Sequence, residues 1–348
     1  MNADKRHIVF LTPGFAENET DTTSIPALQD YLKLIRKNLP DTKLTVLTFQ
    51  FPFTNKKYNW HGIDIIPLNG KNNKLNKIII WFKAWQILKN LNHKTPINVI
   101  HSFWIGECSF IGQNFSKFFK IKHIVTAMGQ DVFKNKYAGY INTFKSYVVT
   151  LSKNQNSLLL KNYDLKSEII PWSIPLEDFP NLKKNEIDIL GVGSLNLVKN
   201  YYTFINVIEA LVNKYPHLKV AIIGEGKESE NIKQEIIKRN LNATITLYGK
   251  LQRADVLEKM SSSRILLHTS NYESFGYVFA EALYSGMKIV SFDVGAAKII
   301  PEWKICLSTQ EIIETCLANL TTTESSKYRV LLNTQTEILH SYLKLYYE

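Results

Sequence analysis

Cysteine is scarce in this sequence, and long apolar runs are missing. Only three cysteines occur among 348 residues, and none stands at a CxxC or other metal-ligand spacing; they are Cys108, Cys306 and Cys316. This number is too small for a disulfide-built scaffold and favours a reducing compartment, so we expect a cytoplasmic protein. The apolar run Ile8–Thr12 is too short for the core of a signal peptide, and Ile78–Phe82 is stopped by Lys83. We therefore expect neither a leader nor a membrane-spanning segment.

Acidic residues are also fewer than basic ones. The sequence holds 42 Lys and Arg against 31 Asp and Glu, a formal net charge of +11. Such a surplus attracts polyanions, an anionic membrane surface or small anionic substrates, and it is equally compatible with a lysine-rich solvated surface. Because no RNA-recognition or helix-turn-helix pattern is present, we expect no nucleic-acid partner.

Apolar residues make up 45% of the chain, and they form short runs that alternate with amphipathic stretches. Three stretches place their apolar residues on one helical face: Ile25–Asn38, Lys77–Leu91 and Tyr201–Lys214. Strands that alternate with helices indicate a parallel sheet covered on both faces. The pattern predicts an α/β protein with two Rossmann-like, doubly wound domains that face each other across a cleft. The expected strands are His7–Leu11, Lys43–Phe49, Ile63–Leu68, Val99–Ser102, Ile124–Ala127, Tyr147–Leu151, Glu168–Pro171, Asp188–Val192, Lys219–Ile223, Thr244–Tyr248, Arg264–His268, Lys288–Phe292 and Lys304–Leu307.

A proline-rich segment, Pro171–Asn185, interrupts the alternation and marks the connection between the domains. We predict an N-terminal Rossmann-like domain over residues 1–172, a linker over 173–185 and a C-terminal Rossmann-like domain over 186–325. Residues 326–348, with the helical pattern Tyr328–Tyr346, are expected to form a helix that packs back toward the N-terminal domain.

The stretch Asn271–Gly286 carries two carboxylates eight positions apart, Glu273 and Glu281. If a helix begins near Gly276, its first amides point outward and form a site for a phosphate. A carboxylate on each side of that phosphate could bind sugar and ribose hydroxyls, as a nucleotide sugar requires. On spacing alone, the favoured explanation is an amphipathic helix with Glu281 on its solvated face.

This stretch, ESFGYVFAE, resembles the E-x7-E signature of retaining glycosyltransferases of family 4, which have the GT-B fold. Further segments resemble the same family: Thr126–Asp131, Gly191–Leu195 with Lys199, Ala221–Gly226, Tyr248-Gly249 and Ala282–Val290. The similarity is strong from Gly191 to Gly295 and looser before it.

The resemblance implies that the N-terminal domain binds the acceptor and the C-terminal domain binds the nucleotide-sugar donor. It also implies a role for each matching residue. Glu273 would contact the donor sugar, and Glu281 would bind the nucleotide ribose. Lys199 would neutralise the leaving diphosphate without a metal ion or other cofactor. The remaining donor-binding residues would be Phe275, Gly276, Tyr277, Gly193, Ser194 and Gly14.

Four positions depart from the family pattern. Ser194 stands where an arginine is usual, and Arg253, Lys250 or Lys227 could supply the missing charge. Met128 replaces a histidine. A glycine pair is reduced to Gly14, and another reads Gly295-Ala296 with Lys298 nearby. These departures leave room for altered chemistry.

Two features of the N-terminal half concern the acceptor. The segments Lys77–Leu91 and Phe115–Lys122 mix lysine with aromatic residues, which suits either a membrane-surface helix or a core helix with Trp81 and Trp85 buried. His101 and Asp131 are weaker candidates for contact with the acceptor.

We therefore predict a retaining, metal-independent glycosyltransferase. It would move a sugar from a UDP- or GDP-sugar to a saccharide or lipid-linked saccharide in cell-surface polysaccharide synthesis. We expect a cytoplasmic protein that is either soluble or peripheral to the inner face of the membrane. Two alternatives remain open: another GT-B enzyme, such as a sugar-nucleotide epimerase, and a non-catalytic basic binding protein.

Overall fold

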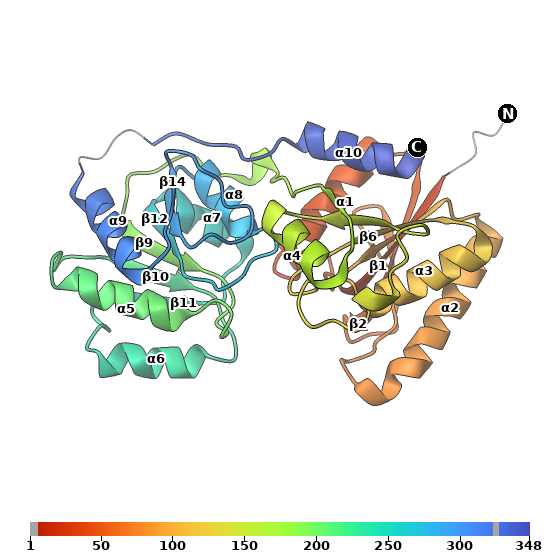
Figure 1. Cartoon of the computed structure of the whole chain (residues 1–348), viewed down its shortest axis with the longest axis horizontal. Coiled ribbons are helices and arrows are strands. Elements are labelled where there is room, and N and C mark those ends of the chain that lie inside the picture. The colour runs from red at the N-terminus through yellow and green to blue at the C-terminus, as the bar shows by residue number, and fades with distance from the viewer. Residues whose placement is uncertain (1–5, 323–326) are drawn as a thin grey trace. The chain divides into compact units, whose positions relative to one another are not determined.

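The computed structural model of the chain describes residues 6–322 and 327–348. Contacts between Cα atoms divide it into two compact units (Figure 1). Unit 1 comprises Met1–Ser173 and Gln335–Glu348, and unit 2 comprises Ile174–Thr334. The expected boundary at residues 325 and 326 lies outside the described residues. Within those residues, no helix has the length and apolar character needed to cross a bilayer.

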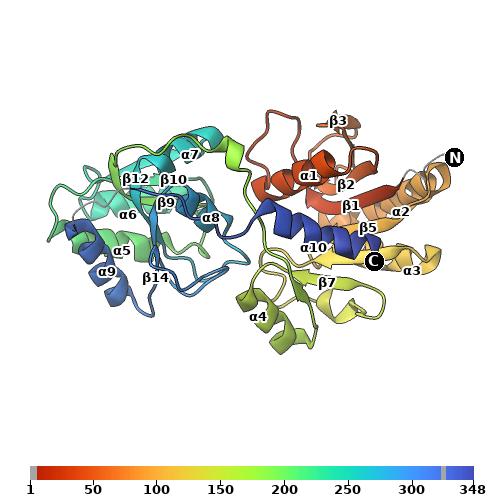
Figure 2. The same cartoon turned by 90° about the horizontal axis from the view of Figure 1, so that it is seen from above.

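Unit 1 is built on a sheet of eight strands in the order β3-β4-β2-β1-β5-β6-β7-β8. The central strand β1 is buried along almost its whole length, as expected for a parallel strand covered on both faces. Helices α2 and α3 cover one face, and α1 and α10 cover the other (Figure 2). The strands are β1 (His7–Gly14), β2 (Lys43–Phe51), β3 (Tyr58–Trp60), β4 (Ile63–Pro67), β5 (Val99–Phe103), β6 (Lys122–Thr126), β7 (Tyr147–Thr150) and β8 (Glu168–Ile169). The helices are α1 (Pro26–Asn38), α2 (Lys77–Lys94), α3 (Glu107–Phe119), α4 (Lys153–Tyr163) and α10 (Gln335–Tyr347), with short 3-10 turns at η1 (Lys74–Asn76) and η2 (Ala138–Tyr140).

Two features of the fold differ from the expectation. Strand β3 was not predicted, and it pairs antiparallel with β4 at the edge of an otherwise parallel sheet. Helix α10 begins at Gln335 rather than Tyr328. The preceding residues are not helical because they bond to unit 2 instead: the Val330 amide donates to the Leu283 carbonyl at 3.1 Å, and the Arg329 guanidinium donates to the carbonyls of Tyr284 and Pro180.

Unit 2 is built on a six-stranded parallel sheet in the order β11-β10-β9-β12-β13-β14. One apolar core lies between the sheet and α5, α6 and α9, and a second lies between the sheet and α7 and α8. The strands are β9 (Ile187–Val192), β10 (Val220–Ile223), β11 (Ile245–Gly249), β12 (Ser263–His268), β13 (Lys288–Ser291) and β14 (Trp303–Ile305). The helices are α5 (Tyr201–Val212), α6 (Ser229–Lys238), α7 (Arg253–Ser261), α8 (Tyr277–Tyr284) and α9 (Thr309–Thr321), and the 3-10 turn η3 (Leu176–Asp178) precedes β9.

The strand order of unit 2 reverses between β9 and β12. Strands β10 and β11 follow β9 toward one edge, whereas β13 and β14 follow β12 toward the other. In open α/β sheets, ligands bind beyond the carboxyl ends of the strands at such a reversal. The loops that leave Val192 and His268 are therefore the first place to look for a site.

Candidate active site

The turn between β12 and α8 is shaped by two glycines. Gly276 caps α8 in the left-handed conformation, with φ at +77°, and a Cβ there would lie 2.4 Å from the Phe279 ring. Gly295 lets a second loop approach closely, because a Cβ on it would lie 2.4 Å from the Phe275 carbonyl oxygen. The Ala296 amide donates to that same oxygen at 2.8 Å. The turn that leads into α8 is thus fixed by the conformation of Gly276 and by the contact with the loop at Gly295 and Ala296.

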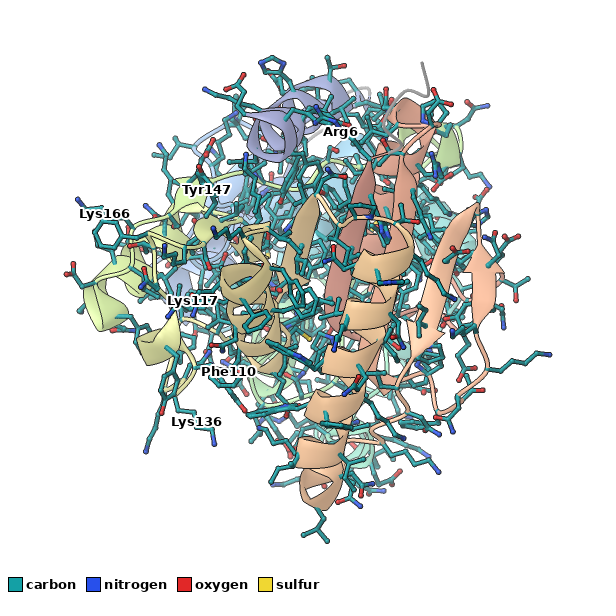
Figure 3. All side chains as sticks on the ribbon, turned by 90° about the vertical axis from the view of Figure 1, so that its right-hand side faces the viewer. Arg6, Phe110, Lys117, Lys136, Tyr147 and Lys166 are labelled. Atoms are coloured by element: carbon teal, nitrogen blue, oxygen red, sulfur yellow. The ribbon has the colours of Figure 1, made fainter. Side chains whose placement is uncertain are left out.

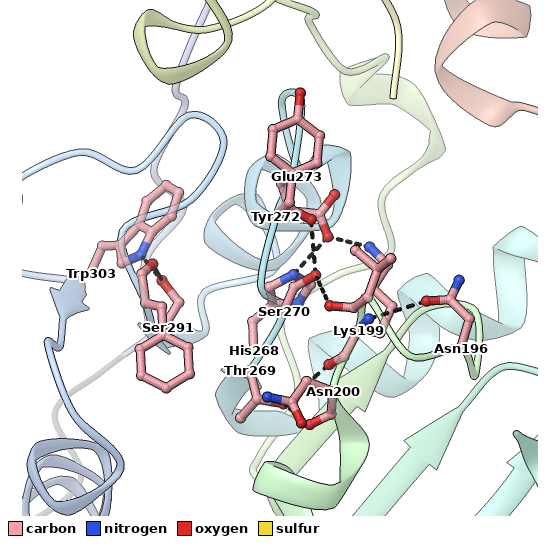
Figure 4. A network of polar contacts seen from close by, with 12 residues as sticks. Asn196, Lys199, Asn200, His268, Thr269, Ser270, Tyr272, Glu273, Ser291 and Trp303 are labelled. Atoms are coloured by element: carbon pink, nitrogen blue, oxygen red, sulfur yellow. Dashed lines mark hydrogen bonds and ion pairs between the residues drawn. The ribbon is translucent and has the colours of Figure 1, made fainter. Parts of the chain in front are cut away.

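The side chains of Lys199 and His268 both contact one carboxylate oxygen of Glu273, beside this turn (Figure 4). The Lys199 ammonium, from the loop after β9, forms an ion pair with Oε1 of Glu273. Nε2 of His268, the last residue of β12, lies 2.8 Å from the same oxygen. The side chain of Glu273 is only 13% exposed and that of Lys199 is 21% exposed. The reversal point of the sheet therefore carries a partly buried, hydrogen-bonded ion pair.

The residues after His268 hold Lys199 in place through its backbone. Thr269 Oγ1 donates to the carbonyls of Lys199 and Asn200, at 3.3 and 3.0 Å, and Ser270 Oγ donates to the Val198 carbonyl at 3.1 Å. The Asn271 amide donates to the Val198 carbonyl at 2.8 Å. The loop that carries Glu273 thus fixes the loop that carries Lys199, and the two charges are positioned as one unit.

The protonation states of this cluster follow from its contacts. Burial raises the pKa of Glu273, but the Lys199 charge and the His268 hydrogen bond outweigh it and bring the pKa to about 2. Burial lowers the pKa of His268 below its ordinary value, although Glu273 acts in the opposite direction. Near neutral pH the carboxylate is therefore charged, and the imidazole is neutral and donates Nε2–H to it.

A second ion pair lies further along α8. Glu281 is buried on this helix, and its Oε1 lies 3.2 Å from the guanidinium of Arg253, the first residue of α7. The Arg253 guanidinium also lies over the Tyr277 ring, 5.4 Å from its centroid. The interpretation of Glu281 as a residue on a solvated face is wrong, because the side chain is only 11% exposed. Arg253 is one of the residues that could replace the positive charge missing at Ser194. In the structure, Glu281 balances its charge.

The other predicted donor-binding residues fall into two places. Gly193 and Ser194 begin the loop that leads to Lys199, and Phe275, Gly276 and Tyr277 form the turn into α8, so all five belong to unit 2. Phe275 is buried, which leaves only its backbone for a ligand. Gly14 ends β1 in unit 1, where Thr12 Oγ1 donates to its carbonyl at 2.9 Å.

His101 requires a correction. Its side chain is fully buried, and its two ring nitrogens lie 2.8 Å from the Tyr346 hydroxyl and from Thr126 Oγ1. A ring so enclosed cannot contact an acceptor, and His101 instead joins β5 to α10 and β6. Asp131 accepts from the amides of Ile105 and Met128, at 2.7 and 2.8 Å. It therefore holds the loops after β5 and β6 together, and any effect on a ligand would pass through those loops.

His268 is the site residue that was not predicted from the sequence. It stands where the resembling family usually has an apolar residue, which is a signal that could have been followed. The contact itself could not be read from the sequence, because a histidine at a strand end is most often a satisfied core residue.

Comparison with known proteins finds a family match for part of the chain. Residues 174–314 match the model of the family described as Glycosyl transferases group 1. This segment, about two fifths of the chain, is similar to the group 1 glycosyltransferases. The predicted resemblance is thus confirmed at the level of the group, and the matched residues include Lys199, His268, Glu273 and Glu281.

Two curated relatives illustrate the extent of the similarity. One component of the human phosphatidylinositol N-acetylglucosaminyltransferase is 29% identical over 152 residues, which is 42% of this chain and 31% of the relative. The uncharacterized glycosyltransferase MJ1178 of Methanocaldococcus jannaschii is 25% identical over 269 residues, 74% of this chain and 73% of the relative. The chain thus spans less than one third of the length of the human protein.

Solved structures establish the fold. Sucrose-phosphate synthase from Thermosynechococcus elongatus superposes with a TM-score of 0.74 at 14% identity, over 90% of both chains. Anabaena Alr3699/HepE, solved in complex with UDP and glucose, gives a TM-score of 0.67 at 15% identity, over 91% of this chain and 90% of that one. The predicted GT-B fold is confirmed.

Proposed function

We propose that this protein transfers a sugar from a nucleoside diphosphate sugar to a saccharide acceptor, with retention at the anomeric carbon and without a metal ion. The observation that carries the proposal is the meeting of Lys199, His268 and Glu273 where the sheet of unit 2 reverses, beside the start of α8. Unit 2 would bind the donor and unit 1 would bind the acceptor, and the chain passes from one unit to the other at Ser173 and Ile174.

The donor would place its diphosphate near Lys199 and the first amides of α8. An ammonium ion and helix-start amides both stabilise the negative charge that grows on a departing phosphate. Before the donor binds, the ion pair with Glu273 holds the Lys199 ammonium at the turn. When the donor binds, Lys199 would pair with its diphosphate instead. Glu273 would accept hydrogen bonds from the sugar hydroxyls, and Glu281 would accept them from the ribose.

In the retaining reaction, the bond between the anomeric carbon and the β-phosphate oxygen breaks, and its electron pair stays on that oxygen. The acceptor hydroxyl forms the new C–O bond on the same face of the ring and gives its proton to the departing phosphate. The protein supplies position and charge compensation and forms no covalent bond to the sugar. This assignment needs no nucleophilic residue.

An apolar stripe on unit 1 supports a lipid-linked acceptor. Four exposed apolar side chains on η1 and α2 share one helical face, while the opposite face of α2 packs on the sheet with Ile80 and Ala84. Exposed lysines such as Lys83 lie on the same helix. Apolar and cationic side chains together suit the surface of an anionic membrane. We therefore propose that this stripe contacts the inner face of the cell membrane. The enzyme would act there in the synthesis of a cell-surface polysaccharide. The members of this stripe are Leu75, Ile78, Ile79 and Phe82, which are 89%, 78%, 54% and 64% exposed.

A thermal-shift panel of UDP-, GDP- and ADP-sugars tests the donor, and product analysis tests transfer. We expect one nucleotide series to raise the melting temperature, and the rate to be unchanged by EDTA. Lys199→Ala and Glu273→Gln should each lower transfer at least about 100-fold, the effect typical of losing one charge-stabilising group. Lys183→Ala is the matched control, because Lys183 forms an exposed ion pair with Glu258 in the same unit, 2.6 Å apart. Near-normal transfer by both site variants would exclude the assignment.

A further inference from the structure

Unit 1 contains a pocket of about 620 Å³ that none of the predicted site residues lines. It lies beyond the carboxyl ends of the neighbouring strands β2, β1 and β5, which is the ligand-binding edge of an open parallel sheet. Most of its wall surface is apolar, although six of the eleven lining residues carry polar or charged side chains, and such a mixture suits a small organic ligand. The residues used below are Phe49, Gln50, Lys77, Trp104, Glu107 and Lys136, all of which line it.

Trp104 is the most unusual of these residues. It follows β5 with φ at +67°, a left-handed conformation that bulky L residues rarely adopt. Its amide donates to the Thr126 carbonyl at 3.0 Å, which fixes the backbone, and its side chain is only partly buried. Strained residues of this kind are retained where their side chain serves a purpose, and an indole in a pocket offers a flat apolar face with a polar edge.

Two of the charged residues that line the pocket, Lys77 and Glu107, form an ion pair with each other. Lys77 Nζ lies 2.9 Å from Glu107 Oε1 and donates to the Tyr137 hydroxyl, and Glu107 Oε2 accepts from Trp81 Nε1 at 3.0 Å. Lys77 and Glu107 therefore neutralise each other and are held rigidly in the wall.

Lys136 behaves differently. It is exposed, and among residues 6–322 and 327–348 it forms no ion pair, although its ammonium lies 5.5 Å from the centre of the Tyr137 ring. Figure 3 shows Lys136 on the side of unit 1 that α2 and α3 cover. Its positive charge at the pocket is thus uncompensated. An anionic group bound there would gain a partner without breaking an existing ion pair.

We propose that this pocket binds the acceptor, and that the acceptor is a saccharide with an anionic substituent. The sugar ring lies against the Trp104 indole, the Gln50 side-chain amide bonds to a hydroxyl, and the anionic group meets Lys136. This inference rests on the proposed function only in calling the bound saccharide the acceptor. The pocket and its charge are features of unit 1 and do not depend on that function.

The test uses the full chain and saturation-transfer NMR with matched sugars: glucose, glucose 1-phosphate, glucose 6-phosphate and glucuronic acid. We expect the anionic sugars to bind at least about tenfold more tightly than glucose, and Lys136→Glu to remove that preference. The phosphates and the carboxylate together separate a requirement for charge from one for phosphate. Equal binding of glucose would overturn the anionic assignment, and no binding by any of the four would overturn the pocket as a saccharide site.

Trp104→Gly gives a second readout. Glycine adopts this backbone conformation without strain, so we expect an unchanged or higher melting temperature together with loss of sugar binding. Trp104→Phe should keep most of the binding. A fall in melting temperature of several degrees in Trp104→Gly would show that the indole serves packing instead. The binding of UDP or GDP, measured in parallel, should not change in any of these variants. Failure of nucleotide binding in the unaltered protein would argue against the proposed function and leave the pocket result separate.

Discussion

His268 Nε2 lies 2.8 Å from Oε1 of Glu273, and the Lys199 ammonium is paired with that same oxygen. The three residues come from the end of β12, the turn before α8 and the loop after β9. One carboxylate oxygen thus receives a neutral donor and a charged one. In the proposed reaction, the other carboxylate oxygen of Glu273 accepts hydrogen bonds from the sugar hydroxyls.

Replacing His268 with leucine would remove the neutral donor. Since a hydrogen bond to a charged group is worth about 1.5–3 kcal/mol, we expect the rate of transfer to fall about 10- to 100-fold. The effect should appear in kcat more than in the donor KM, because His268 orients Glu273 and does not bind the nucleotide. Steady-state kinetics with varied donor measures both constants. His217→Leu, an exposed histidine of unit 2, should leave them unchanged. An unaltered kcat in His268→Leu would show that Lys199 alone fixes Glu273.

Arg253 and Glu281 form a pair that can be tested by a double-variant cycle. Their side chains are each 11% exposed, so removing one charge leaves the other nearly buried. We expect Arg253→Ala to lower the free energy of unfolding by about 3 kcal/mol or more, and the double variant with Glu281→Gln to recover part of that loss. Denaturant melts at pH 7 measure the stabilities.

The same variants should separate stability from nucleotide binding. Glu281→Gln should weaken UDP or GDP binding about tenfold in a titration, because an amide binds a ribose diol less well than a carboxylate does. Full nucleotide affinity in Glu281→Gln would contradict the assignment of Glu281 to the ribose.

Buried histidines of unit 1 should make the protein sensitive to mild acid. Burial lowers the pKa of His7 to about 4 and that of His123 to about 3, from an unfolded value of 6.5. Between pH 6.5 and about 4, both histidines stay neutral in the folded chain, whereas the same histidines become protonated in the unfolded chain. Folding stability should therefore be complete above pH 6.5 and fall by about 1.4 kcal/mol per pH unit for each histidine between pH 6.5 and 4.

Denaturant melts at pH 7, 6 and 5 would measure this slope. In His123→Asn the slope should be smaller by the share of one histidine. His93→Asn, at an exposed position on α2, is the matched control and should keep the slope of the unaltered protein. Equal slopes in all three proteins would mean that His123 is protonated within the folded chain.

The apolar stripe on α2 can be tested with vesicles. Ile78→Glu and Phe82→Glu place carboxylates on the surface proposed to meet the membrane, so cosedimentation with anionic phosphatidylglycerol vesicles should fall at least about tenfold. Binding of the unaltered protein should weaken with added salt, because part of the attraction is electrostatic. Ile237→Glu makes the same change at an exposed apolar position of α6 in unit 2 and should have no effect. No vesicle binding by the unaltered protein would exclude the membrane proposal.

Local patterning predicted most elements, and its failures have physical reasons. Strand β3 has only three residues and pairs with a neighbour at the sheet edge, so its apolar pattern is too short to detect. Residues 328–334 have a helical apolar period, yet Arg329 and Val330 are bonded to Tyr284 and Leu283. Tertiary hydrogen bonds outweighed a local preference there.

Short-range spacing in the sequence was enough to predict the alternation of strands and helices and the glycine turn at the start of α8. The candidate roles of Lys199 and Glu273 came from the resemblance to a known family. The partners of those residues depend on the three-dimensional arrangement of the chain. That arrangement brought His268 and Lys199 to one oxygen of Glu273, paired Arg253 with Glu281, enclosed His101 between β6 and α10 and set Trp104 in a strained conformation at a pocket. Each of these depends on strands or helices far apart in the chain lying side by side, which no local pattern records.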